Sequence, residues 1–293
     1  MSVSEANSVP NQLDSEQLKN ISRSDLLKVQ KPAQYLGGEH NSVLKDPAEV
    51  DVRFALAFPD LYEVGMSHVG IQLLYEIINS NPKFWAERAF MPMADMEALL
   101  RDKNQSLTSL ESKTPLGDFD FIGFSLQYEL CSTNLLNMLD LSGVPLWQRE
   151  RDLNDPIIIG GGPYTYHPEP VSDFFDLFFL GDAEEAIEEI LKIKSSWNKK
   201  SREELSKLSR QDLLLEFSKV EGIYVPSLYE ETFDSEQKFT GFKALEGAPE
   251  TVTRRLLATM EGAPYLKKPI VPNIETVHNR LSVEVMRLSL IHI

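Results

Sequence analysis

Apolar residues follow two different spacings along the chain, and these spacings predict the order of the elements. Residues 52–58 (VRFALAF) form a short, nearly continuous apolar run, which predicts a buried strand. The same pattern recurs in three later stretches, residues 119–126, 156–159 and 174–180. Apolar positions with helical spacing occupy the intervals, residues 69–79, 95–102, 132–141 and 183–197. Strands that alternate with helices in this way predict an α/β fold with a parallel sheet.

The pattern changes near residue 198, where we expect a domain boundary. Residues 198–220 are highly charged and keep a helical period, whereas residues 222–229 begin a stretch of β-like composition with several prolines. The first 30 residues are polar and rich in Ser, Asn and Glu, which predicts a mobile extension with at most one short helix. A short apolar piece lies around residues 85–90.

Charge and cysteine content narrow the classes of function. The 293 residues carry 29 Lys and Arg against 45 Asp and Glu, a net charge of −16, which disfavours binding to nucleic acid. Cys131 is the single cysteine, so one chain cannot form a disulfide or hold a cysteine-ligated zinc or iron–sulfur cluster. No apolar run approaches the ~20 residues of a membrane span, and no secretion signal is visible. We therefore expect a cytoplasmic protein.

Candidate chemistry gathers where the predicted strands end, because ligands of open parallel sheets bind beyond the carboxyl ends of the strands. The first loop, residues 58–70, holds Asp60, Gly65 and Gly70 and is longer than the ~2–6 residues of an ordinary connection. The alternative is that residues 58–70 are an ordinary connecting loop in which Ser67 caps the following helix. We interpret His68 in this loop as a solvated histidine.

The second and third loops follow the next two strands. Ser125 and Gln127 are donors and acceptors that suit a polar cofactor, although the hydroxyl groups near residue 132 also serve as helix caps. Glycines 160–162 permit close approach of a ligand to the backbone, with a simple turn as the alternative. Cys131 fits a small buried residue better than a nucleophile.

The fourth segment, residues 181–185, places carboxylates at the start of a helix. Glu184 could bind ribose hydroxyls or amides, or only interact with the helix dipole, and both interpretations stay open. The sequence contains no dinucleotide fingerprint, no P-loop, no H-x-x-x-H metal pair and no serine-hydrolase motif. The candidate site is therefore one for a bound cofactor.

Taken together and in this order, these segments resemble the N-terminal part of an uncharacterised family of radical S-adenosylmethionine (SAM) proteins with a B12-binding-like domain. The matching stretches are YLGGEHNSV (35–43), ALAFPDLYEVGMSHVGIQLLY (55–75), ERAFMPMADME (87–97), LTSLES (107–112), DFDFIGFSLQYEL (118–130), GGPYTYHPEP (161–170), FFDLFFLGDAEE (174–185), GIYVPSLY (222–229) and VHNRLSVEVMR (277–287). The resemblance covers about residues 30–287.

The resemblance implies a cobalamin-binding, Rossmann-like domain followed by a barrel that binds a [4Fe–4S] cluster and SAM. It divides the chain into a mobile extension (1–34), a B12-binding-like domain (35–197), a helical and β linker (198–276) and the start of a barrel (277–293). Cobalamin domains of the mutase type carry D-x-H-x-x-G with a cobalt-ligating histidine. Here Asp60 and Gly65 keep that pattern, while Tyr62 replaces the histidine.

Two expectations follow for the cluster and for function. The family continues with Gly-Cys after Arg287, whereas this chain ends in LSLIHI, so we expect a truncated protein that is not catalytic alone. We expect a cofactor-binding module whose ligands come from residues 60, 62, 65, 70, 125, 127, 160–162 and 184, and whose partner is its own barrel. The alternatives are a non-catalytic recognition or scaffold domain and a nucleotide-binding α/β enzyme.

Overall fold

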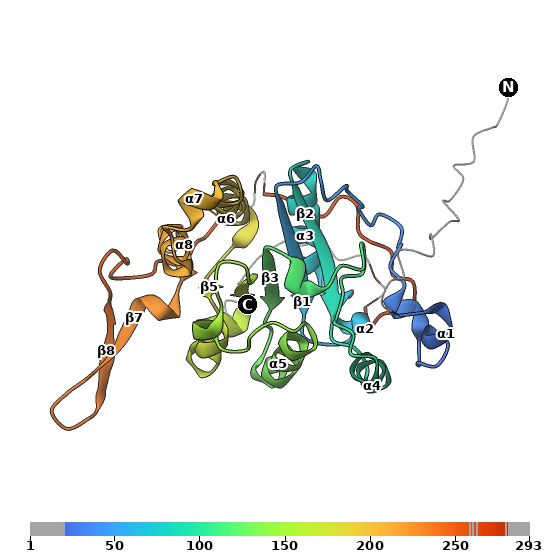
Figure 1. Cartoon of the computed structure of the whole chain (residues 1–293), viewed down its shortest axis with the longest axis horizontal. Coiled ribbons are helices and arrows are strands. Elements are labelled where there is room, and N and C mark those ends of the chain that lie inside the picture. Colours follow the sequence, from blue (N-terminus) through green and yellow to red (C-terminus); the bar gives the residue numbers. More distant parts are fainter. Residues whose placement is uncertain (1–20, 258, 260, 262, 279, 281–293) are drawn as a thin grey trace.

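A six-stranded sheet forms the centre of the molecule in the computed structural model, which describes residues 21–257, 259, 261, 263–278 and 280 (Figure 1). The strands are β1 (Val52–Phe58), β2 (Phe84–Phe90), β3 (Phe121–Ser125), β4 (Ile157–Gly161), β5 (Leu177–Phe179) and β6 (Ile223–Tyr224). Their order is β2-β1-β3-β4-β5-β6, with β6 antiparallel to β5 and the other pairs parallel. The predicted Rossmann-like α/β fold is confirmed.

The strand order defines where a ligand can bind. β1 pairs with β2 on one side and with β3 on the other, so the chain reverses its direction of winding between β1 and β3. The order 2-1-3-4-5 is one of the two common doubly wound arrangements, and ligands bind at its switch point, beyond the carboxyl ends of β1 and β3. The loops that sequence analysis singled out follow these strands and their neighbours.

Helices cover both faces of the sheet. One face packs against α3 (Val69–Ser80), α6 (Ala183–Asn198) and α8 (Arg210–Phe217), and the other against α4 (Ala94–Asp102) and α5 (Ser132–Leu141). Strand β1 serves both cores, because Phe54 and Leu56 point to the first face while Ala55 and Ala57 point to the second. This alternation follows from the two-residue period of a strand.

The remaining elements are short. They include α1 (Arg23–Leu26), α2 (Tyr62–Gly65), α7 (Arg202–Leu205) and the hairpin of β7 (Tyr229–Phe233) and β8 (Phe239–Ala244), which projects away from the main sheet (Figure 1). Single 3-10 turns occupy Pro32–Tyr35, Leu116–Asp118, Glu129–Cys131, Gln148–Glu150, Pro163–Tyr166, Glu169–Phe174 and Pro226–Leu228. The described part of the chain contains no helix with the length and apolar character of a membrane span.

Residues beyond 197 contribute to the same core as the domain before them. Leu213, Leu214 and Phe217 of α8 pack on the sheet, and Phe217 lies 5.8 Å from the ring of Phe121 on β3. Arg210 at the start of α8 donates from Nε and Nη2 to the two carboxylate oxygens of Asp176, each at 2.9 Å. A buried ion pair therefore fixes α8 to the loop that precedes β5.

The segment of residues 263–278 returns along α3 toward α2 (Figure 1). The backbone N–H of Ile270 donates to Oε1 of Gln72 at 3.0 Å, and the N–H groups of residues 267 and 268 donate to Glu76. The N–H of Asn273 donates to the hydroxyl of Tyr62 at 3.1 Å. We call residues 267–278 the return segment. Of the expected extension, residues 1–34, the first 20 lie outside the described residues, as does the segment after residue 280, whereas Leu26 and Gln34 of that extension are buried.

Candidate functional site

A cleft of about 600 Å³ opens between α3 and α6, over the carboxyl ends of β1, β3 and β4. Phe54, Leu56 and Ile159 of the strands form its floor. The two walls are apolar faces of the helices, formed by Val69, Leu73 and Leu74 of α3 and by Ala183, Ile187 and Ile190 of α6. Its size falls within the ~300–1,000 Å³ typical of small-molecule sites. Its position is the switch point that the strand order defines.

Glycines shape this cleft, and only one of them lacks a reason within the fold. Gly123 lies under the ring of Phe54, and Gly162 has φ +103°, so both are required by packing or backbone conformation. Gly161 lines the cleft, yet a Cβ built at this position would meet no atom within 4 Å. The absence of a side chain at Gly161 therefore leaves space in the cleft that a ligand can use.

Polar groups line the mouth of the cleft. Gln127 donates from Nε2 to Oγ of Ser125 at 3.0 Å, and Nδ1 of His68 accepts from the N–H of Ile71 at 3.4 Å, which caps α3. Burial lowers the pKa of His68, although its hydrogen bond with Gln127 acts in the opposite direction. His68 is therefore a neutral imidazole at pH 7, and the mouth presents hydrogen-bonding groups with the carboxylate of Glu184 among them.

Six of the predicted site residues lie together in the lining of the cleft. They come from the first turn of α3, from the ends of β3 and β4 and the loops that follow them, and from the first turn of α6: Gly70, Ser125, Gln127, Gly161, Gly162 and Glu184. The rule that parallel strands end at one edge is enough to bring them together, although they are far apart in sequence.

The other four predicted residues lie elsewhere. A Cβ on Gly65 would lie 2.3 Å from the ring of Phe90, and one on Gly160 would lie 2.6 Å from Phe178, so these two glycines serve packing. Asp60 accepts from the hydroxyl of Tyr128 at 3.1 Å, outside the cleft lining.

Tyr62, which the sequence pattern places at a cobalt-ligand position, points into the protein. It is 2% exposed, and its hydroxyl donates to Oε1 of Glu39 at 3.0 Å while accepting from Asn273. The cause is local: the single turn α2 directs this side chain toward the buried Glu39 and away from the cleft.

Sequence reasoning missed two parts of the site. His68, interpreted as a solvated histidine, is partly buried and lines the cleft mouth. Ile187 and Ile190 form a wall of the cleft, but their apolar stripe on the acidic helix α6 predicts only core packing. Cys131 is buried, as expected, and its thiol donates to the carbonyl of Tyr128.

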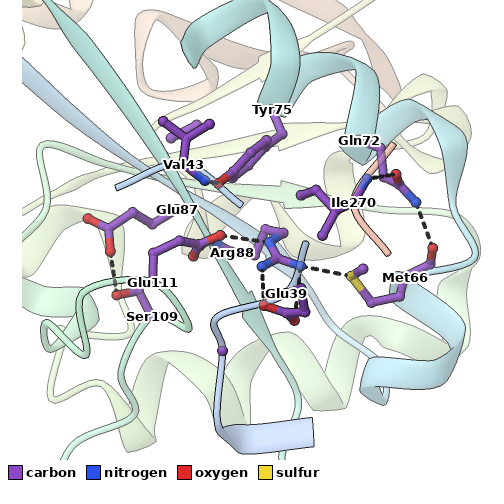
Figure 2. Close-up of polar contacts among 12 residues, drawn as sticks. Glu39, Val43, Met66, Gln72, Tyr75, Glu87, Arg88, Ser109, Glu111 and Ile270 are labelled. Atoms are coloured by element: carbon purple, nitrogen blue, oxygen red, sulfur yellow. Dashed lines mark hydrogen bonds and ion pairs between the residues drawn. The ribbon is translucent and has the colours of Figure 1, made fainter. Parts of the chain in front are cut away.

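Tyr62 belongs to a buried ionic cluster at β2. Arg88, fully buried on this strand, lies between Glu39 and Glu111 and forms ion pairs of 2.8 and 2.7 Å with them (Figure 2). Burial opposes the ionisation of Glu39, but its pairing with Arg88 outweighs this and lowers its pKa. Figure 2 also shows Gln72 linking Met66 to Ile270 of the return segment. Within the described residues, Glu39, Arg88, Glu111 and Tyr62 are paired with one another inside the protein and lie outside the cleft lining.

The structure is a doubly wound α/β sheet with an open cleft at its switch point, the place where sheets of this kind bind ligands. The family model for radical SAM proteins, N-terminal, matches residues 70–226, more than half of the 293 residues. The chain therefore belongs to this family. No curated protein matches it, and no solved structure does. Within the described residues, no group of three His, Cys, Asp or Glu side chains is placed to hold a metal ion.

Proposed function

We propose that this chain supplies the cofactor-binding N-terminal module of a radical SAM protein, and that its cleft takes up the nucleotide end of a cobalamin. The observation that carries the proposal is the open cleft at the switch point, into which Gly161 presents no side chain. Family membership supports the radical SAM context.

The residues of the cleft fit such a ligand. The nucleotide end of cobalamin carries an apolar bicyclic base on a ribose, and the aliphatic walls of α3 and α6 suit the base. Ser125, Gln127 and Glu184 at the mouth suit hydroxyl and amide groups. The corrin ring is bulkier than the cleft and would stay outside it. The bound group would supply organocobalt chemistry, whereas the protein's own residues would bind and orient it.

Tyr62 is left out of the proposed binding set. Its hydroxyl donates to Glu39 and accepts from Asn273 inside the protein, so it points away from the cleft and is not placed to ligate cobalt there. The proposed set is Gly70, Ser125, Gln127, Gly161, Gly162 and Glu184.

In the proposal, a domain other than this module binds the iron–sulfur cluster and SAM. Radical SAM clusters are held by three closely spaced cysteines, and these 293 residues contain Cys131 alone. The partner of the module is therefore a barrel domain that carries those cysteines. In this division residues 35–197 carry the cleft, residues 198–276 are the linker region, whose α8 and β6 pack into the same core, and residues 277–293 are the start of the barrel.

A free nucleotide is the second candidate ligand. The apolar walls suit any aromatic base, and a carboxylate at the mouth, Glu184, suits ribose hydroxyls. The two candidates differ in whether the nucleotide in the cleft belongs to a cobalamin or is free, and titration with cobalamin and with AMP separates them.

The test is a binding titration of the purified chain, followed by calorimetry and absorbance. We expect hydroxocobalamin to bind and cobinamide, which lacks the nucleotide end, to bind at least tenfold more weakly. Gly161→Leu fills the cleft and should weaken cobalamin at least tenfold without a change in unfolding free energy. Ala98→Leu adds three of those four side-chain carbons at an exposed position of α4 and should bind normally. Equal binding of cobalamin and cobinamide, or normal binding by Gly161→Leu, would overturn the proposal. Binding of AMP instead would favour the second candidate.

A further inference from the structure

A second cavity, of about 70 Å³, lies beneath α1, between the Pro32–Tyr35 turn, α4 and the end of β2. It shares no lining residue with the cleft. Most of its wall is apolar and is formed by Leu26, Phe90, Met96, Leu100, Leu107 and Leu110. Its volume is several times the ~10–15 Å³ that holds one water molecule. The cavity therefore has room for a small organic molecule.

Two nitrogen donors in this wall, the Gln34 amide and the Lys113 ammonium, have hydrogen-bonding capacity that the described residues do not fill. Gln34 is 2% exposed, and its Nε2 has no hydrogen-bond partner in the described part of the chain. Lys113 donates from Nζ to the carbonyl of Tyr35 at 2.8 Å. An ammonium group has three donors, and among the described residues Lys113 forms no ion pair that would use the others. Buried donors of this kind are costly without acceptors, so the wall is incomplete as it stands.

The pKa of Lys113 also indicates that its buried ammonium group is incompletely compensated. Burial lowers the pKa of Lys113 to about 8, because desolvation outweighs the attraction of Glu111, Glu39 and Glu87 and acts with the repulsion of Arg88. Tyr35 and Tyr62 also line the cavity, and burial raises the pKa of both. Among the described residues that line the cavity, Lys113 is the only charged side chain at pH 7, and the three carboxylates that attract it lie outside the lining.

We propose that this cavity binds a short-chain monocarboxylate. The carboxylate accepts hydrogen bonds from the Lys113 ammonium and the Gln34 amide, and the alkyl chain lies against the leucine and methionine side chains of the wall. A carboxylate is the acceptor that pairs with an ammonium group, and the apolar lining accommodates carbon rather than further charge. The volume limits the chain to a few carbons. This site is independent of the proposed cobalamin cleft.

The first experiment uses the unmodified full chain. Acetate, propionate, butyrate and hexanoate are titrated at pH 7.0 and constant ionic strength, with the thermal midpoint and calorimetry as readouts. We expect saturable binding for the two- to four-carbon acids, and binding at least tenfold weaker for hexanoate and for butyramide, the neutral isostere of butyrate. At pH 9.5 the lysine is deprotonated, so butyrate should bind at least tenfold more weakly than at pH 7.0.

The second experiment uses variants. Lys113→Met and Gln34→Leu should each abolish or weaken butyrate binding at least tenfold. Lys192→Met, at an exposed lysine on α6, should bind as the wild type does. Equal binding of butyrate and butyramide, equal binding at the two pH values, binding that survives Lys113→Met, or no saturable binding of any acid would each overturn the proposal. If Lys113→Met does not fold, the butyramide and pH comparisons on the wild type decide the question.

Discussion

The hydroxyl of Tyr62 donates a hydrogen bond to Oε1 of Glu39 at 3.0 Å, inside the protein. Glu39 in turn accepts from Arg88, so the tyrosine is one end of the buried ionic cluster on β2. Its hydroxyl also accepts from the N–H of Asn273 in the return segment. A residue at a position typical of cofactor ligation therefore joins three segments of the chain.

Tyr62→Phe should destabilise the protein while leaving the cleft intact. The change removes a hydrogen bond to Glu39 and leaves the N–H of Asn273 without its acceptor, which should cost about 1–3 kcal/mol in urea unfolding. Tyr128→Phe removes a hydroxyl from a side chain that is 44% exposed and should cost less than ~0.5 kcal/mol. A larger loss of cobalamin binding than of stability would contradict the inward placement of Tyr62.

Arg88→Met should lower the unfolding free energy far more than Tyr62→Phe does. Removal of this cation takes the ion-pair partner away from the buried Glu39 and Glu111, at a cost of about 3–5 kcal/mol. The deficit should shrink at pH 5, because the variant can then protonate these carboxylates. Arg101→Met, which breaks partly exposed ion pairs with Glu97 and Asp140, should lower the unfolding free energy far less than Arg88→Met does. Similar losses of unfolding free energy in Arg88→Met and Arg101→Met would refute the prediction that the buried ion pairs contribute more than the exposed ones.

His68 should make stability depend on pH below neutrality. Burial lowers its pKa in the folded state, so the unfolded chain binds the proton more readily. Its contribution to stability is present above the ordinary histidine value of ~6.5 and is lost as pH falls through the lower folded pKa. Unfolding free energies between pH 7 and pH 5 should fall less steeply for His68→Gln than for the wild type. Identical slopes would disprove the prediction.

Arg210→Met should loosen α8 from the sheet. Asp176 is fully buried and keeps only Arg151 as a cationic partner in the variant, so we expect a loss of about 3 kcal/mol. Amide hydrogen exchange should accelerate in α8 more than in β3, since β3 does not depend on this ion pair. Lys207→Met, at an exposed lysine of the preceding turn, should leave both rates unchanged. Uniform acceleration would show that α8 and β3 unfold together.

The sequence predicts most of the sheet because apolar runs bounded by polar turns are a local signal. β2 is the exception: its centre is Glu87-Arg88, a pair of charges that is atypical of a buried strand. The partners that neutralise Arg88, Glu39 and Glu111, lie far away in the sequence. No local pattern shows that these distant residues pair with Arg88. The sequence therefore predicts only a short apolar piece at residues 85–90 and not a strand.

The candidate site divides in the same way. Ser125, Gln127 and Gly161 are predictable because parallel strands end at one edge, so topology alone brings them together. The inward placement of the Tyr62 side chain could not be predicted, because it depends on the single turn α2 and on Glu39, which is distant in the sequence. The depth of the cleft is set by how far α3 and α6 stand apart, and side-chain periodicity carries no measure of that distance.

The return segment has a mechanical consequence. Its backbone is tied to Gln72 and Glu76 of α3, and the N–H of His278 donates to Ser67 immediately before that helix. The same helix forms one wall of the cleft. A force on the chain at residue 278 is therefore transmitted to α3. Movement of the return segment and the width of the cleft are coupled through this helix.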